Sequence, residues 1–75
     1  MELLIRSIVK PLVDFPEDIQ VEKREEANKI VYHLTVNEED IGKVIGKNGR
    51  IANAIRTIVY SANSNEKKRV YLDIM

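Results

Sequence analysis

The chain has 75 residues, and its twelve basic and twelve acidic side chains give a formal net charge of zero. Whole-chain charge therefore does not mark it as a protein that binds nucleic acid or a membrane surface. It has no cysteine, which excludes disulfides and thiolate metal sites, and its 44% hydrophobic residues are too many for a disordered chain. We expect a single domain over residues 1–75 that is stabilised by apolar packing.

The sequence shows no signal for a membrane or for export. Residues 1–6 lack the basic start, long apolar centre and small-residue cleavage site of a signal peptide. No apolar run approaches the roughly 18–20 residues that a membrane-spanning helix needs. We therefore expect a cytoplasmic protein, and the absence of cysteine agrees with that compartment.

The first segment, residues 2–13, is predicted to form a helix. Its apolar residues recur at three- and four-residue spacings, which places them on one helical face. Pro11 lacks an amide hydrogen and crowds the preceding turn, so we expect a kink or a restart of the helix at that position. Residues 15–18, Phe-Pro-Glu-Asp, are predicted to form the turn that leaves the helix.

Two alternating segments follow. Residues 19–23 alternate apolar and polar side chains, and residues 29–36 do so more clearly. The polar stretch between them, residues 24–28, is short. The pattern predicts an antiparallel hairpin whose second strand turns His33 away from the core, as a surface residue rather than a ligand or base.

The second half of the chain is predicted to hold two helices and a last strand. Asn37 can cap a helix whose first turn, residues 38–40, is acidic, as the helix dipole favours. Gly46 limits that helix to a few residues. Apolar spacing predicts a longer helix from Ile51 to Ala62, ended by the polar residues 61–65, and residues 69–75 alternate as a strand.

The predicted element order is therefore αββααβ, which is an α+β fold. The two helices between the second and third strands give enough chain for a parallel connection. A three-stranded mixed sheet with all three helices on one face would bury every apolar stripe.

The charges are divided unevenly along the chain. Residues 1–40 hold five basic and ten acidic side chains, a balance of −5, and residues 41–75 hold seven basic and two acidic ones, a balance of +5. No acidic residue lies between Ile41 and Ala62, and this stretch contains all three glycines, Gly42, Gly46 and Gly49. Flexible backbone and unopposed positive charge therefore coincide in one segment.

This glycine segment favours a phosphate ligand. Gly46 and Gly49, which are separated by two residues, permit unusual backbone conformations and the close approach of another backbone. The long helix begins there, so its free amides and positive dipole end favour an anion. Val44 and Ile45 supply an apolar wall for bases. Three cations are expected to neutralise phosphates: Lys43, Lys47 and Arg50.

The run Val44-Ile45-Gly46-Lys47-Asn48-Gly49 resembles the VIGxxG signature of the KH domain, whose GxxG loop holds about four nucleotides. The element order matches the type II form of that fold. More narrowly, the chain length, Lys10-Pro11-Leu12-Val13-Asp14 followed by Pro16-Glu17, and the run from Gly42 to Ala52 resemble the small bacterial RNA-binding family KhpA. The resemblance covers essentially the whole chain.

The resemblance implies a protein that binds single-stranded RNA, is not an enzyme and uses no metal or other cofactor. It implies a role as RNA chaperone or post-transcriptional regulator linked to cell-wall growth and cell shape, and pairing with a second copy or with the larger KH protein KhpB (Jag). Ala52 stands where the KH pattern often has a branched aliphatic residue, so the sequence leaves open whether Ile51 or Ile55 lines the groove. The residues expected to contact RNA are Lys43, Val44, Ile45, Gly46, Lys47, Asn48, Gly49, Arg50, Ile51, Ile55 and Arg56.

Other interpretations fit less well. A Walker nucleotide site needs four residues between its glycines and a Ser or Thr after the lysine, whereas three residues separate Gly42 from Gly46 and Asn48 follows Lys47. The acidic residues 38–40 would point in different directions, which favours capping over a metal site. We expect no membrane or small-molecule partner. The alternative is a protein–protein interaction module of KH fold, for which acids or a lost glycine near the loop would be expected.

Overall fold

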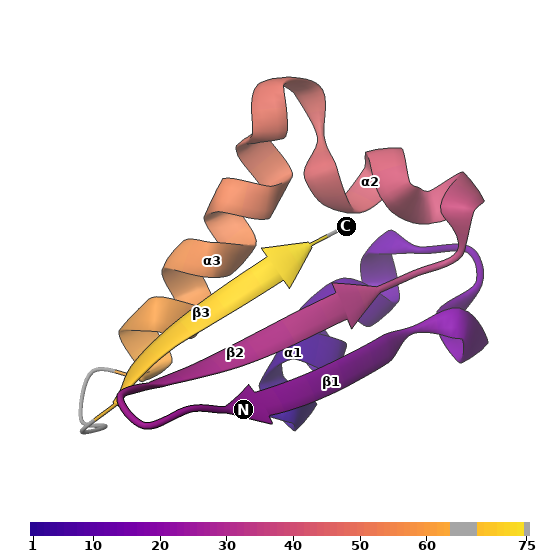
Figure 1. The fold of residues 1–75 in the computed structure, drawn as a ribbon. Helices are drawn as coiled ribbons and strands as arrows, with labels where there is room; N and C mark the ends of the chain where they lie inside the picture. The colour runs from indigo at the N-terminus through magenta and orange to yellow at the C-terminus, as the bar shows by residue number, and fades with distance from the viewer. Residues whose placement is uncertain (64–67, 75) are drawn as a thin grey trace.

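The computed structural model describes residues 1–63 and 68–74. Figure 1 shows the predicted αββααβ order, and the α+β class is confirmed. The helices and strands are α1 (Glu2–Val9), β1 (Gln20–Glu25), β2 (Lys29–Thr35), α2 (Ile41–Ile45), α3 (Arg50–Ala62) and β3 (Arg69–Ile74). Four single 3-10 turns stand between them, at Lys10–Leu12, Pro16–Asp18, Glu38–Asp40 and Lys47–Gly49.

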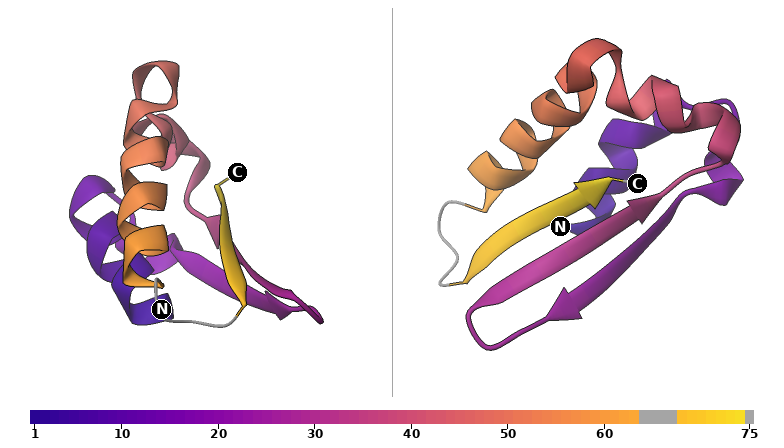
Figure 2. Two further views of the ribbon diagram at one scale, coloured as in Figure 1. Left: turned by 90° about the vertical axis from the view of Figure 1, so that its left-hand side faces the viewer. Right: turned by 45° about the horizontal axis from the view of Figure 1, so that its top comes forward.

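The sheet is mixed, as the sequence predicts. Its strand order is β1-β2-β3, with β1 antiparallel and β3 parallel to the central strand β2. In this register, Tyr32 of β2 lies opposite Lys23 on one side and Leu72 on the other. All three helices lie on one face of the sheet, as the side view in Figure 2 shows.

The core lies between that sheet face and the helices. The strands supply alternate residues and the helices supply residues at three- and four-residue spacings, so the two periodicities meet in one apolar layer. The buried core residues are Ile5, Val9, Ile19, Tyr32, Leu34, Val36, Val44, Ile55, Val59, Val70 and Leu72.

The first helix ends where the proline predicts. α1 stops at Val9, and Pro11 lies in the 3-10 turn that follows, after which Val13 is extended. The exit turn is also present, because the Asp18 amide donates to the Phe15 carbonyl with an N···O distance of 3.0 Å. A continuous helix to residue 13 is therefore replaced by a helix and a tight turn.

The hairpin is longer than its apolar pattern predicts. β1 runs to Glu25, so Arg24 and Glu25 pair with β2 instead of forming the connection. β1 is an edge strand, and charged side chains are common on edge strands because they discourage pairing with other chains. The turn itself is residues 26–28, closed by the Glu26 amide and the Lys29 carbonyl with an N···O distance of 2.8 Å.

The remaining boundaries are close to those expected. The Asn37 side chain accepts a hydrogen bond from the Glu39 amide at 2.8 Å, so it caps the turn before α2. α3 begins one residue before the predicted Ile51 and ends at Ala62. β3 is described to Ile74. Residues 64 and 65 of the predicted polar stop, and Met75 of the predicted strand, lie outside the described residues.

Candidate nucleic-acid interface

Residues 46–49 join α2 to α3 through an unusual backbone. Gly46 has φ 75° and ψ 176°, a conformation that is essentially restricted to glycine. Gly49 is left-handed, with φ 75° and ψ 15°. Asn48 is also left-handed, with φ 59° and ψ 24°, and asparagine is among the non-glycine residues that adopt this region most often. The sequence of the loop thus matches the conformations that it adopts.

The loop backbone packs tightly on the first turn of α3. A Cβ atom placed on Gly46 would lie 2.6 Å from Cγ1 of Ile51, far inside normal contact. By contrast, a Cβ atom on Gly49 would meet nothing within 4 Å. Gly46 is therefore required both for its backbone conformation and for this close approach, whereas Gly49 is required for conformation alone.

Two cations and a helix start share this loop. Lys47 and Arg50 are exposed, and α3 begins at Arg50 with Gly49 before it and no acidic residue in its first turn. Gly49 offers no side-chain cap to this 13-residue helix, and the Arg50 amide donates to the Lys47 carbonyl. The positive dipole end of α3 therefore faces this loop without an acidic side chain beside it, which favours an anion. Within residues 1–63 and 68–74, the side chains of Lys47 and Arg50 make neither an ion pair nor a hydrogen bond.

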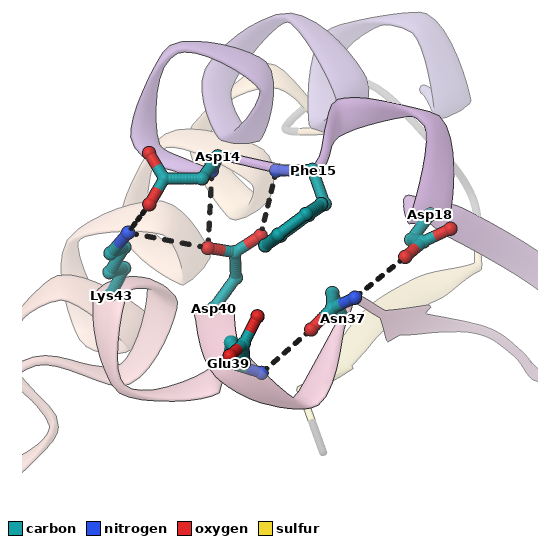
Figure 3. A network of polar contacts seen from close by, with 7 residues as sticks. All are labelled: Asp14, Phe15, Asp18, Asn37, Glu39, Asp40 and Lys43. Carbon is teal, nitrogen blue, oxygen red and sulfur yellow. Dashed lines mark hydrogen bonds and ion pairs between the residues drawn. The ribbon is translucent and has the colours of Figure 1, made fainter.

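Asp40, at the other end of α2, is fully buried, and both of its carboxylate oxygens have polar partners (Figure 3). Its Oδ1 accepts the Asp14 amide at 3.1 Å, and its Oδ2 accepts the Phe15 amide at 3.0 Å. The ammonium of Lys43 lies 3.5 Å from Oδ1 and is also paired with the Asp14 carboxylate. We call these four residues, Asp14, Phe15, Asp40 and Lys43, the Asp40 cluster. It ties the segment after α1 to the start of α2.

The ionisation of the cluster follows from these contacts. Burial raises the pKa of the Asp40 carboxyl, but the two backbone amides and Lys43 lower it by more, so this pKa lies below its ordinary value. The hydrogen bond to Asp14 raises the pKa of Lys43 above its ordinary value, against a smaller effect of desolvation. Both groups are therefore charged at neutral pH.

Sequence reasoning missed this cluster. It assigned Asp40 to the acidic first turn of a helix and Lys43 to phosphate binding. Asp40 does lie four residues before the buried Val44, so the helical period places both on the inward face. This spacing between Asp40 and Val44 was the signal in the sequence that could have indicated a buried carboxylate. The partners Asp14 and Phe15 lie 26 and 25 residues away, and nothing in the local pattern indicates them.

The family model described as "KhpA/KhpB, KH domain" matches residues 2–74. The chain belongs to this family. RNA-binding protein KhpA of Oceanobacillus iheyensis is 63% identical over 75 residues, which cover 100% of both chains. KhpA of Listeria monocytogenes is 53% identical over 75 residues, 100% of this chain and 99% of its own. KhpA of Bacillus subtilis is 50% identical over 74 residues, 99% of this chain and 91% of its own.

Within this KhpA/KhpB KH domain, the apolar residues expected beside the loop divide into two groups. Val44 and Ile55 are 0% and 2% exposed, so their side chains are part of the core and not of the surface. Ile45 and Ile51 are half-buried and pack against the core from its edge. Of the two candidates that the sequence left open, Ile51 is therefore the accessible one.

Arg56 of the KH domain is engaged within the fold. Its Nε donates to the Leu72 carbonyl at 3.1 Å, and its guanidinium also bonds Oδ1 of Asn53 at 3.3 Å. The structure thus brings Lys47, Arg50 and Ile51 together at the loop and holds Lys43 and Arg56 elsewhere. In the described part of this chain, no helix is long and apolar enough to cross a bilayer, and no group of three or more acidic or histidine side chains is placed to hold a metal ion.

Proposed function

We propose that this protein binds single-stranded RNA through the Gly46–Gly49 loop. The observation that carries the proposal is the loop itself, a backbone held in left-handed conformations at the start of α3, with Lys47 and Arg50 beside it. Phosphates would lie against the glycines and the positive dipole end of α3. Bases would lie against the half-buried Ile45 and Ile51. Membership of a KH family and relatives named as RNA-binding proteins support this function.

We propose Lys47 and Arg50 as the phosphate contacts, because Lys43 and Arg56 have partners within the fold. Two phosphates neutralised on a single strand predict a slope of log K against log salt of about −1.4. Binding by one domain should therefore be weak and only modestly salt-dependent. We propose that the protein acts in the cytoplasm as an RNA chaperone or post-transcriptional regulator. We propose no catalytic role for it.

The test replaces the two central residues of the loop by acids. In the double variant Lys47→Asp/Asn48→Asp, negative charge stands where phosphate must lie, and we expect a loss of affinity of about tenfold or more. The matched control is Lys10→Asp/Asn28→Asp, which makes the same charge change at two exposed positions. Binding is measured by fluorescence polarisation with labelled single-stranded RNA, and folding by circular dichroism. Equal binding by the folded loop variant and the control would refute the proposal.

We further propose that useful affinity comes from two KH domains acting together, either two copies or this chain with a KhpB-type KH protein. Joining two weak sites raises the effective concentration of the second. The open face of the sheet supports an interface, because the 40% exposed ring of Tyr71 lies beside its cross-strand neighbour Val31. Light scattering of the isolated protein at tens of micromolar should show a dimer. A monomer there would leave only the heteromeric partner.

A further inference from the structure

The outer edge of β3 is covered at one position by two side chains of α3. Arg56 donates to the Leu72 carbonyl with an N···O distance of 3.1 Å, and the Leu72 amide donates to the Tyr60 hydroxyl at 3.4 Å. Arg56 and Tyr60 are four residues apart, so they project from the same face of α3, one turn apart. We call these three residues, Arg56, Tyr60 and Leu72, the clasp.

The clasp takes both backbone groups that Leu72 presents to the outside. β3 stands at the end of the sheet order, and an edge strand offers a row of N–H and C=O groups to any molecule beside it. The backbone N–H and C=O groups of successive residues in a strand point to opposite sides, so the groups on this outer edge belong to Val70, Leu72 and Ile74. Leu72 is the central one of the three. Its use by α3 divides the edge into two parts.

The two parts of the edge differ in what lies beside them. The Ile74 end of β3 lies next to α2, and the Val70 end lies toward the last turn of α3 (Figures 1 and 2). The loop joins α2 to α3, so only the Ile74 end is on the loop side. Arg56 is six residues after Arg50, about 9 Å along the helix axis. The open surface between the loop and the clasp is therefore short.

We infer that Arg56 and Tyr60 set the end of the RNA site. Nucleotides extend from the loop toward Ile74 and stop at Leu72, where a guanidinium and a phenol occupy the strand edge that bases would otherwise use. This inference rests on the proposed function and names the residues that determine the length of RNA bound. Arg56 then acts as a boundary of the site and not as a phosphate contact. Asn53 holds the guanidinium in that place.

The first test measures how affinity depends on RNA length. Random-sequence single-stranded RNAs of four and eight nucleotides are bound to the parent and to the double variant Arg56→Met/Tyr60→Phe. The affinity of the parent should rise with RNA length only because an eight-nucleotide RNA offers more positions at which the site can bind. In the variant, the ratio of the two affinities should rise by about fivefold, the low end for one added base contact. Using the ratio cancels the general effect of a lost positive charge.

The matched control for length dependence is Lys10→Met/Ser61→Ala. It removes one charge and one hydroxyl at exposed positions, and Ser61 is the neighbour of Tyr60 on α3. Its affinity ratio should equal that of the parent. If the clasp variant also shows the parent's ratio, the inference is overturned. If the parent and the Lys47→Asp/Asn48→Asp variant bind RNA equally, the proposed function fails instead, because that variant leaves the clasp intact.

A second test needs no RNA and keeps the inference falsifiable if the double variant unfolds. Amide hydrogen exchange of Leu72 is followed by NMR in Tyr60→Phe, which removes only the hydroxyl from a 40% exposed side chain. We expect exchange at Leu72 to become about fivefold faster or more, since its acceptor is lost. Ser61→Ala should leave it unchanged. Unchanged exchange in Tyr60→Phe would show that the clasp does not form, and would overturn the inference.

Discussion

The two ends of α2 use their polar groups in opposite ways. At the N-terminal end, the buried Asp40 carboxylate is bonded to two backbone amides and to Lys43, and each of these groups belongs to the chain itself. At the C-terminal end, the loop leaves the Lys47 side chain exposed at the start of α3, which has no side-chain cap. Lys43 and Lys47 are one helical turn apart in sequence, yet the first holds the fold together and the second is available to a ligand. Positive charge near a loop is therefore not enough to assign it to binding.

The first and largest effect is expected from breaking the Asp40 end. In Asp40→Asn, an amide replaces the carboxylate, so one of the two backbone donors faces an NH₂ group and Lys43 loses a counterion. Substitutions that leave a buried polar group without a hydrogen-bond partner are among the most destabilising in proteins. We expect a larger loss of stability than from any substitution in the loop, measured by urea unfolding. The exposed neighbour, in Glu39→Gln, should leave the midpoint nearly unchanged, and an equally stable Asp40→Asn would contradict the role of the cluster.

The second effect comes from the loop backbone. Gly46→Ala forces a side chain into a conformation reserved for glycine and against Ile51, and should cost about 2–4 kcal/mol of unfolding free energy. Gly49→Ala meets no neighbour and should cost only about 1–2 kcal/mol. Gly42→Ala, in the exposed part of α2, should be neutral or stabilise by up to about 1 kcal/mol. Denaturant titrations that failed to give this order would contradict the described loop geometry.

The third effect separates the two lysines directly. Lys47→Met should weaken binding of single-stranded RNA by about threefold to tenfold and reduce the salt slope by about 0.7, with unchanged stability. Lys43→Met should do the reverse. It should lower stability, and under conditions where the variant is fully folded it should change RNA affinity by less than about twofold. Polarisation assays at several salt concentrations measure the first quantity and thermal unfolding the second. Equal losses of RNA affinity in the two variants would contradict the assignment of Lys43 to the fold and of Lys47 to RNA binding.

The smallest effect is a dependence of stability on pH. The pKa of Asp40 is lowered in the folded state, so its contribution is complete above the ordinary value of 3.8 and is lost as pH falls below it. The pKa of Lys43 is raised, so its contribution is complete below 10.5 and is lost as pH rises past that value. Unfolding measured from pH 2 to 12 should show a weaker acid loss in Asp40→Asn and a weaker alkaline loss in Lys43→Met. Parallel profiles for all three proteins would contradict this assignment.

Much of the fold follows from local patterns, and much of the polar organisation does not. The alternation in residues 29–36 and the apolar spacing of residues 51–62 identify β2 and α3, because burial on one face imposes those periods. Pro11 and Asn37 likewise mark the boundaries that they form. The end of β1 was missed because charged residues on an edge strand leave no apolar alternation to read.

The same limit applies to the candidate site. The loop was predicted because its glycines, asparagine and cations are contiguous in sequence. The partners of Lys43 and Arg56 were not, because Asp14 is 29 residues and Leu72 is 16 residues away. Which of two neighbouring apolar residues is buried depends on the angle at which α2 meets the sheet, and a short helix gives too few residues to fix that phase. The sequence therefore does not decide which of Val44 and Ile45 faces outward, and the structure places Val44 in the core.

The parallel pairing of β3 with β2 has a consequence for how the protein is made. β2 is synthesised early, but its second neighbour, residues 69–74, is produced only after α2, the loop and α3. On the ribosome, the loop therefore emerges before the strand that completes the sheet beneath α3, and the clasp on Leu72 can form only after β3 has emerged. A nascent chain that already displays its glycine loop has therefore yet to acquire the strand edge that we propose as the boundary of the RNA site.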